Sequence, residues 1–544
     1  MDIAHTNKGS IKVADVTILH LSRGLYRSTA TAFKELVSNS YDADAVEVRI
    51  NTNFPEFDFI SCVDNGNGMS INEFLKYFNQ YGIGTGTKRS GHKDKTEIYN
   101  RPLIGRMGIG MMAIGQICHS FEIESHYIDE NKKGVAYQAE IILLDEDIPD
   151  KESQIRADRD DIDDFDVGRW EYGIIPFEEK KIGFRIYSSD VRETFTNEMK
   201  SSVDDRDISL ISFDQDILHE EFFDKGNKSI RECKPYLETI WELASLCPIP
   251  YYGTKSKYPI DFKSFKSVDQ NEEYNKVKLL INQIQNQFLN ENFRVIFDGI
   301  ELRRHISLPN EEDIIPKVYY LEYSETILDN KLSFVGYIFA QVSKYIKPLE
   351  VNGFQIRLRG VGIGGYDSTF LKYYKQVETV RSKWLSGEIF INQGLESALT
   401  INRDGFNEHD EHYKALQTFI HDKLDSIFSD IEKTARMKRD KKKAKNDEII
   451  QNNLNSIFEA HLPKKYKLKW LEAGDSKPFV YPDKVKKEII INISVRPFGR
   501  KIKANNIMEN VLISHCISRI CKGTENEKDN KFNAILKEVL SKII

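Results

Sequence analysis

Two polar residues on one short segment have types and spacing that suit phosphate chemistry. Glu35 and Asn39 lie four residues apart, in a stretch where Phe33, Leu36 and Val37 indicate a helix. That spacing places both polar side chains on one helix face, one turn apart. A carboxylate beside an amide oxygen suits a water molecule and a hard divalent cation, because Mg²⁺ takes oxygen ligands. Taken alone, the pair would equally fit a solvated helix face.

Glycine-rich segments follow in a fixed order. A strand predicted over residues 57–63 ends in an Asp-x-Gly-x-Gly sequence over 64–68, and residues 82–88 form a polar, glycine-rich stretch. Residues 105–110 then read Gly-x2-Gly-x-Gly ahead of an apolar run. Glycines let backbone amides approach an anion closely, and a following helix N-terminus adds positive potential. Each segment alone fits an ordinary turn or loop, but the series together indicates a nucleotide site.

This series resembles the nucleotide site of the GHKL (Bergerat-fold) ATPase superfamily, which includes gyrase, heat-shock protein 90, histidine kinases, MutL and MORC proteins. Residues 35–39 nearly repeat the heat-shock protein 90 helix, and residues 86–88 look like that family's lid motif. Far downstream, residues 399–404 resemble the middle-domain loop whose arginine, here Arg403, reaches the γ-phosphate. Residues 42–48 lean toward MutL and MORC proteins, so the chain looks like a divergent bacterial-type relative.

The resemblance implies a Mg²⁺-dependent ATPase with ATP as its nucleotide. Glu35 would position and deprotonate the attacking water, Asn39 would hold Mg²⁺, and Asp64 would read the adenine. Arg403 would act as an arginine finger from a second domain, so that hydrolysis requires the domains to dock. The remaining nucleotide-binding residues would be Gly66, Gly68, Met69, Lys88, Gly105, Gly108, Ile109 and Gly110.

One departure concerns a later strand, where the superfamily usually has a Gly-Thr pair whose threonine helps to hold the adenine. The best candidate here is Gly183-Phe184, which lacks the hydroxyl. Adenine binding through Asp64 is therefore better supported than any later contact to the base.

The expected fold class is α/β (α+β), with three domains. Residues 1–255 would form the Bergerat-fold ATPase sandwich, closed by a helix that ends before Pro248. Residues 256–435 would form a middle domain of ribosomal S5-like type, and residues 436–450 a basic linker. Residues 451–544 would form a small mixed domain ending in an amphipathic helix. Most apolar stripes of this kind belong to a core. The alternative, by analogy with the related chaperones, is a surface for homodimerisation or for binding a partner.

Composition excludes several classes of function. Hydrophobic content is 40%, charged content is 30%, and no apolar run is long enough for a membrane span. The six scattered cysteines fit a reduced, cytoplasmic protein without a disulfide frame or a zinc site. The net charge of -7 argues against a chain-wide nucleic-acid surface. Only 34 residues precede Glu35, which disfavours a sensor histidine kinase.

Two charged runs leave the choice of partner open. Residues 145–166 carry eleven acids and fit a solvated insertion, whereas residues 433–445 carry eight bases and one acid. The basic run fits a solvated helix end or a contact with nucleic acid or an acidic partner. We expect a heat-shock protein 90-like chaperone or switch acting on a protein client or effector, as in bacterial relatives in antiphage defence. The alternative is a MORC- or MutL-like ATPase acting on DNA.

Overall fold

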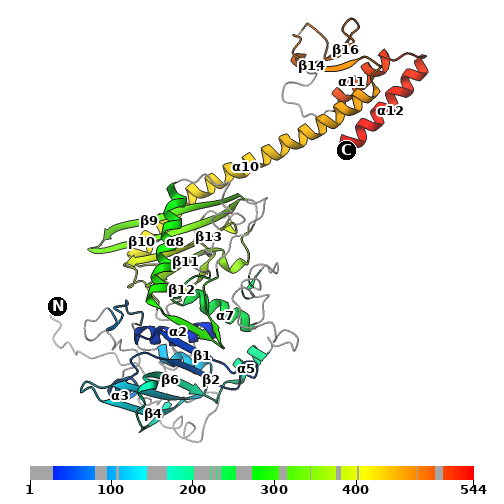
Figure 1. Cartoon of the computed structure of the whole chain (residues 1–544). Coiled ribbons are helices and arrows are strands. Elements are labelled where there is room, and N and C mark those ends of the chain that lie inside the picture. The colour runs from blue at the N-terminus through cyan, green and yellow to red at the C-terminus, as the bar shows by residue number, and fades with distance from the viewer. Residues whose placement is uncertain are drawn as a thin grey trace, which may run out of the picture. The chain divides into compact units, whose positions relative to one another are not determined.

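The described part of the chain has an α+β architecture with three sheets (Figure 1). The computed structural model describes residues 28–79, 95–105, 110–143, 168–200, 218, 222, 229–230, 235–252, 272–305, 315–342, 345–374, 382–400, 404–474, 476–495 and 507–543. The chain divides into two compact units, residues 1–428 and residues 429–544, which are described separately. The predicted acidic insertion at 145–166 lies outside the described residues.

The first sheet has eight strands in the order β5-β4-β3-β6-β2-β1-β7-β8. The β1–β7 pair is parallel and all its other pairs are antiparallel. The strands are β1 (Glu47–Asn51), β2 (Ile60–Asp64), β3 (Ser120–Ile128), β4 (Gly134–Leu143), β5 (Gly168–Ile174), β6 (Gly183–Ser188), β7 (Arg294–Phe297) and β8 (Ile300–Glu301). Strands β7 and β8 of this sheet thus lie beyond residue 255, where we expected the first domain to end. That domain boundary stays a prediction.

Helices cover this sheet and complete its core. Helix α2 (Thr29–Asp42) contacts the 3-10 helix η2 (Gly110–Gln116) and helix α7 (Pro235–Leu246). As predicted, α7 ends ahead of Pro248, because the residue before a proline disfavours helical geometry. The remaining helices described here are α3 (Ile71–Asn79) and α5 (Glu193–Lys200). Strand β2 begins at Ile60, later than predicted, because the positive φ of 52° at Phe57 interrupts an extended chain.

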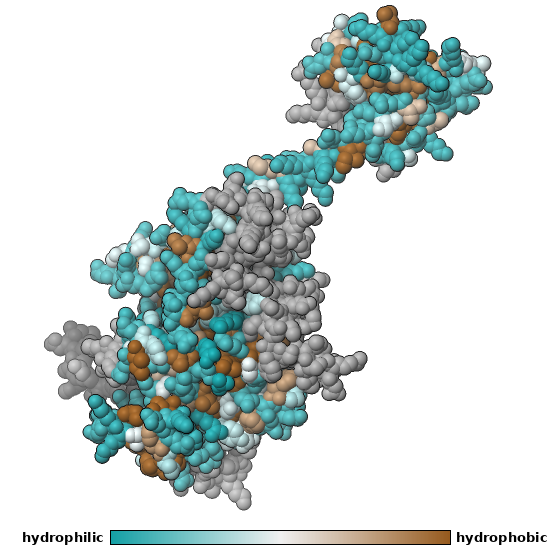
Figure 2. Space-filling view, in the orientation of Figure 1, coloured by the Kyte–Doolittle hydropathy of each residue, from teal (hydrophilic) through white to brown (hydrophobic). Residues whose placement is uncertain are grey.

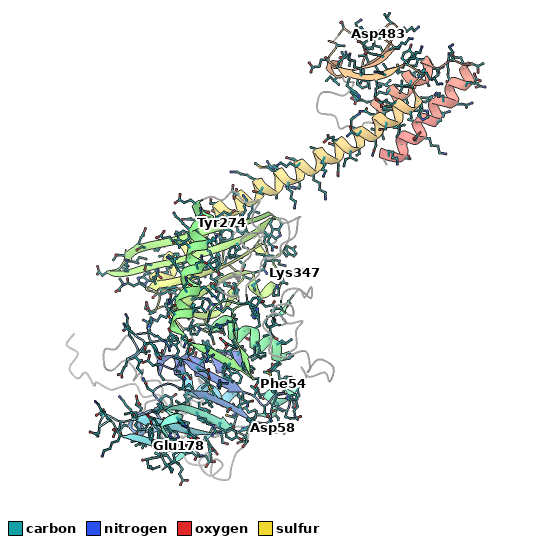
Figure 3. The ribbon with its side chains drawn as sticks, in the orientation of Figure 1. Phe54, Asp58, Glu178, Tyr274, Lys347 and Asp483 are labelled. Carbon is teal, nitrogen blue, oxygen red and sulfur yellow. The ribbon has the colours of Figure 1, made fainter. Side chains whose placement is uncertain are left out.

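The second sheet has five strands in the order β12-β11-β13-β10-β9. They are β9 (Ile315–Ile327), β10 (Asn330–Val342), β11 (Gly353–Leu358), β12 (Val361–Asp367) and β13 (Leu385–Gln393). Helix α8 (Glu272–Glu291) lies along this sheet (Figure 1) and contacts β9 and β10. Tyr274, labelled on α8 in Figure 3, is buried in the core between them.

A buried ionic cluster links α7 to the second sheet. Glu388 on β13 accepts hydrogen bonds from Arg357 Nε at 2.6 Å and from the Tyr251 and Tyr337 hydroxyls. Arg304 Nη1 lies 3.4 Å from the same carboxylate, and Arg357 Nη2 donates to the Ser245 carbonyl on α7 at 2.6 Å. Burial alone would raise the pKa of Glu388, but the two guanidinium groups and the two hydroxyls lower it to about 2.

Helix α10 (Glu411–His461) is continuous through the basic run. Residues 436–450, expected to form a linker, are helical, and no residue between Ile431 and Leu454 is buried. The bases of 433–445 are mostly exposed, and this stretch of the helix surface is largely hydrophilic in Figure 2. The basic run is therefore a solvent-facing helical surface.

The second unit has its own small core. Strands β14 (Lys467–Leu471), β16 (Glu488–Asn492) and β15 (Val480–Asp483) form a sheet that packs with α11 (Ile507–Ile520) and α12 (Glu525–Ile543). Two members of the predicted apolar stripe on α12, Ile535 and Val539, are fully buried in this core. They are therefore not part of an exposed surface, and homodimerisation stays a prediction. None of the described helices is both long and apolar enough to cross a membrane.

Candidate functional site

The first two predicted site residues, Glu35 and Asn39, lie on α2 beside Gly110. Ser28 caps the helix by accepting a hydrogen bond from the Thr31 amide, and most of the helix is buried. A β-carbon placed on Gly110 would lie 2.8 Å from Glu35 Oε2 and 3.5 Å from Asn39 Nδ2. The structure therefore brings Glu35, Asn39 and Gly110 together, although 75 or so positions separate the helix from the glycine, and only glycine fits there without a shift.

Glu35 has a charged partner that the sequence reasoning missed. Lys34 Nζ lies 3.0 Å from Glu35 Oε1, and the two side chains are only 2% and 9% exposed. Even so, Glu35 Oε1 accepts no hydrogen bond of good geometry from the described residues. This oxygen is paired electrostatically with Lys34 and can still accept a well-aligned hydrogen bond from a bound water molecule. The signal in the sequence was a lysine between apolar positions, directly after Phe33 and ahead of Leu36 and Val37.

Asp64 ends β2 beneath the same helix. Its Oδ2 accepts a hydrogen bond from Ser40 Oγ at 2.7 Å, and its Oδ1 accepts one from the Gly66 amide at 2.9 Å. Gly66 is pressed against α2, since a β-carbon there would lie 2.6 Å from the Ala43 carbonyl oxygen. Asp64 is 8% exposed, so its carboxylate is oriented by protein donors before any ligand arrives.

The next predicted residues, Gly68 and Met69, are held by β3. Gly68 has a φ of +72°, in the region that favours glycine. The Met69 amide donates to Ser125 Oγ at 2.8 Å, and Ser125 donates in turn to the Met69 carbonyl at 2.9 Å. The loop after β2 is therefore fixed at both Asp64 and Met69.

The later strand proposed as the Gly-Thr equivalent does lie beside Asp64. Phe184 on β6 pairs with Asp64 on one side and with Ser125 on the other. A β-carbon on Gly183 would lie 2.1 Å from the Asp64 carbonyl oxygen, so glycine is required at this position. No hydroxyl stands at position 184, and the hydroxyls near Asp64 and Met69 are instead those of Ser40 and Ser125.

The amide of Gly105 is used differently from the expectation. It donates to Asp42 Oδ2 at 2.6 Å, while the Ile104 amide donates to Asp42 Oδ1 at 2.7 Å. In this structure the Gly105 amide thus anchors the segment to the end of α2 and does not point to a free anion site. Sequence reasoning missed Asp42 because its partners lie some 60 residues away. Lys88, Gly108 and Ile109 lie outside the described residues.

The segment over residues 399–406, called the downstream loop, is closed by backbone pairing between its two ends and lies near α7. Leu399 pairs with Phe406, and the Thr400 amide donates to the Gly405 carbonyl at 3.0 Å. Arg403 lies within this loop but outside the described residues. Burial raises the pKa of Glu242 on α7; Asp404 raises it further and Lys34 lowers it. Asp404 and Lys34 therefore both lie close enough to Glu242 to interact electrostatically, so Asp404 comes near the middle of α2.

The donor set fits a nucleotide with a magnesium ion. Mg²⁺ is usually held by one or two protein oxygens, several waters and substrate phosphates. Asn39 would supply a protein oxygen, and the described residues contain no cluster of three or more His, Cys, Asp or Glu side chains that would form a separate cage. Gly110 packs closely against Glu35 and Asn39, so its backbone lies beside the side chains that would meet the water molecule and the metal.

Comparison with known proteins agrees with this geometry. Residues 26–166 match the family described as "Histidine kinase-, DNA gyrase B-, and HSP90-like ATPase". The chain is also 38% identical over 113 residues to a protein of Herpetosiphon aurantiacus named "Putative type II restriction enzyme HgiDII". That match covers 20% of this chain and 16% of the relative. The matched N-terminal part of the chain is an ATPase domain of the histidine kinase, DNA gyrase B and HSP90 type.

Proposed function

We propose that the protein is a Mg²⁺-dependent ATPase in which hydrolysis depends on docking of the downstream loop against the ATPase site. The observation that carries the proposal is the meeting of Glu35, Asn39 and Gly110, with Glu35 buried and ion-paired to Lys34. The match of residues 26–166 to an ATPase family supports the same chemistry.

Each side chain has one task in this proposal. Glu35 orients a water molecule and accepts its proton, while Lys34 Nζ lies 3.0 Å from Glu35 Oε1 and helps to position the side chain. Asn39 offers its oxygen to Mg²⁺, which neutralises charge on the phosphates. Asp64 accepts from the adenine amino group, with Gly66 and Met69 shaping the loop around the base.

The downstream loop would complete the site. Arg403 would stabilise the charge that develops on the transferred phosphoryl group, as an arginine finger. Lys88 and the amides of Gly108, Ile109 and Gly110 would enclose the phosphates. Because Arg403 and the phosphate-binding residues belong to segments of different sheets, the nucleotide state would set the position of the downstream loop relative to the ATPase site. This is the behaviour of a heat-shock protein 90-like switch acting on a protein client or effector.

The test is steady-state phosphate release by the full chain with ATP and Mg²⁺, compared with the Glu35→Gln variant. Turnover in the parent and its loss in the variant are expected. A parent protein that binds no ATP would refute the proposal, whereas binding without turnover would leave only an ATP-gated interaction protein.

A defence role is the cellular setting that we propose. The support is the relative in Herpetosiphon aurantiacus, whose name is that of a restriction enzyme. Plaque counts on cells expressing the protein with its neighbouring genes, compared with the same cells carrying Glu35→Gln, test it. Equal plating efficiency on the two strains over a panel of phages would contradict the assignment.

Action on DNA is the second candidate, and the exposed basic run on α10 favours it. Lys441, Lys442 and Lys443 are exposed on consecutive positions of the helix. If they contact phosphates, added duplex DNA should raise ATPase activity, and salt should suppress the effect. Reversing these three charges should reduce the salt dependence of DNA binding, by about one unit of slope per lost contact. The matched control reverses the charges of the exposed Lys484, Lys486 and Lys487. If added DNA does not raise the ATPase activity of the parent, a protein partner is favoured.

A further inference from the structure

The hairpin between β11 and β12 has an unusual residue at its tip. Leu358 pairs with Val361, which leaves a two-residue turn of Arg359 and Gly360 with φ values of +55° and +83°. Such turns favour Asn-Gly or Asp-Gly, because both central residues need positive φ. Gly360 is required, since a β-carbon there would lie 2.9 Å from the Phe288 ring. An arginine at the first position adopts a backbone conformation that asparagine adopts more easily.

The Arg359 side chain reaches the segment that leads into the glycine-rich loop of the ATPase site. Its Nη1 donates to the carbonyl of Leu103, 256 positions earlier in the chain. Leu103 directly precedes Ile104 and Gly105, whose amides are bound by Asp42 of α2. The segment 103–105 is therefore held by α2 through its amides and by the second sheet through a carbonyl.

The same guanidinium group contacts the segment that leads to the downstream loop. Arg359 Nη2 lies 3.2 Å from Glu396 Oε1, and both side chains are only about one-fifth exposed, at 20% and 22%. Glu396 follows β13, and Leu399, three positions later, closes the loop that holds Arg403 by pairing with Phe406. A small pocket around this contact is lined by Ile104, Leu358, Arg359, Val361, Ile363, Glu396 and Leu399.

We propose that Arg359 is a positioning residue for ATP hydrolysis, which sets the downstream loop in register with the glycine-rich segment through Leu103 and Glu396. The inference rests on the proposed ATPase function and adds a residue to it. Arg359 need not touch the nucleotide, because it acts on the two segments that lead to the phosphate-binding glycines and to Arg403. This role explains why an arginine occupies a turn position where asparagine would fit with less strain.

The test uses Arg359→Asn, which removes both contacts while suiting the turn. We expect its melting temperature to equal or exceed that of the parent, and its affinity for a non-hydrolysable ATP analogue to stay within about twofold. Turnover should fall by roughly 10- to 100-fold, the range for losing a hydrogen bond to a charged group. Arg303→Asn is the matched control, because it removes an arginine that pairs with Glu301 in a similar partly buried setting; it should leave turnover unchanged.

A double-variant cycle tests the path through Glu396. Glu396→Gln should lower turnover on its own, and combining it with Arg359→Asn should add little to the loss caused by Arg359→Asn. Parental turnover in Arg359→Asn would overturn this inference alone, as would a loss of analogue affinity equal to the loss of turnover. Absence of ATP turnover in the parent would overturn the proposed function and this inference with it.

Discussion

A substitution of Glu35 can separate catalysis from ATP binding if it does not leave the buried Lys34 without a partner. Lys34 is 2% exposed and lies 3.0 Å from Glu35. Glu35→Ala would leave this ammonium group buried without its partner, at a cost of about 3–5 kcal/mol of folding stability. Glu35→Ala should abolish hydrolysis, but its loss of activity could arise from unfolding. Glu35→Gln keeps the shape and one oxygen acceptor near Lys34, so it should cost less stability while removing the base.

The expected catalytic effect of Glu35→Gln is a fall in kcat of about 10²- to 10⁴-fold, the usual contribution of a general base. Affinity for a non-hydrolysable ATP analogue should change little, because Asp64 and Asn39 bind the base and the metal. Titration calorimetry measures the affinity, phosphate release measures kcat, and circular dichroism confirms folding at the assay temperature. Glu122→Gln, at an exposed position on β3, is the control. A folded Glu35→Gln protein that no longer binds the analogue would refute the assignment of Glu35 as the base.

Three further predictions concern other parts of the molecule. Asp64→Asn should weaken analogue binding by roughly 10- to 100-fold, because a hydrogen bond to a charged group contributes about 1.5–3 kcal/mol; unchanged calorimetric affinity would place the adenine reader elsewhere. Arg403→Ala should lower kcat by about 10³-fold or more with affinity and melting temperature nearly unchanged, since a surface ion pair is worth only about 0–1 kcal/mol; a kcat within twofold of the parent would assign Arg403 to the surface. The pKa of Glu388 is lowered from 4.5 to about 2 in the folded state, so its contribution of about 3 kcal/mol is present above pH 4.5 and is lost as pH falls toward 2. Unfolding free energies measured across this range should fall less steeply for Glu388→Gln, and an equal slope would contradict the role of this carboxyl.

The parts of the site that depend on local pattern could be predicted from the sequence. Glu35 and Asn39 follow from helical spacing, and Asp64 follows from its place at the end of a strand. The partners of these residues could not be predicted, because they depend on long-range packing. Ser40 binds Asp64 across 24 positions, and Asp42 binds the Gly105 amide across 63. No single-sequence pattern indicates such pairs.

Helix α10 shows a different limit. The sequence favoured a solvated helix end and a linker for the basic run of 433–445, yet the helix continues to His461 despite the mutual repulsion of these bases. Lysine, arginine and alanine, which dominate this run, are among the strongest helix formers. Their intrinsic preference outweighs the repulsion, which is weak between solvated charges at physiological salt. In the part of α10 that has no buried residues, the extent of the helix therefore follows helix propensity.

The parallel pairing of β1 with β7 has a consequence for biosynthesis. Arg294 on β7 lies 247 positions after Glu47 on β1. At roughly 5–20 residues per second, a ribosome needs about 12–50 s to make the intervening chain. During that interval the outer edge of β1 has no strand to bond, and an open edge is a template for pairing with other chains. The nascent protein thus depends on a late segment to close its first sheet, and a fragment ending at 255 would keep that edge open, whereas one ending after Arg304 would not.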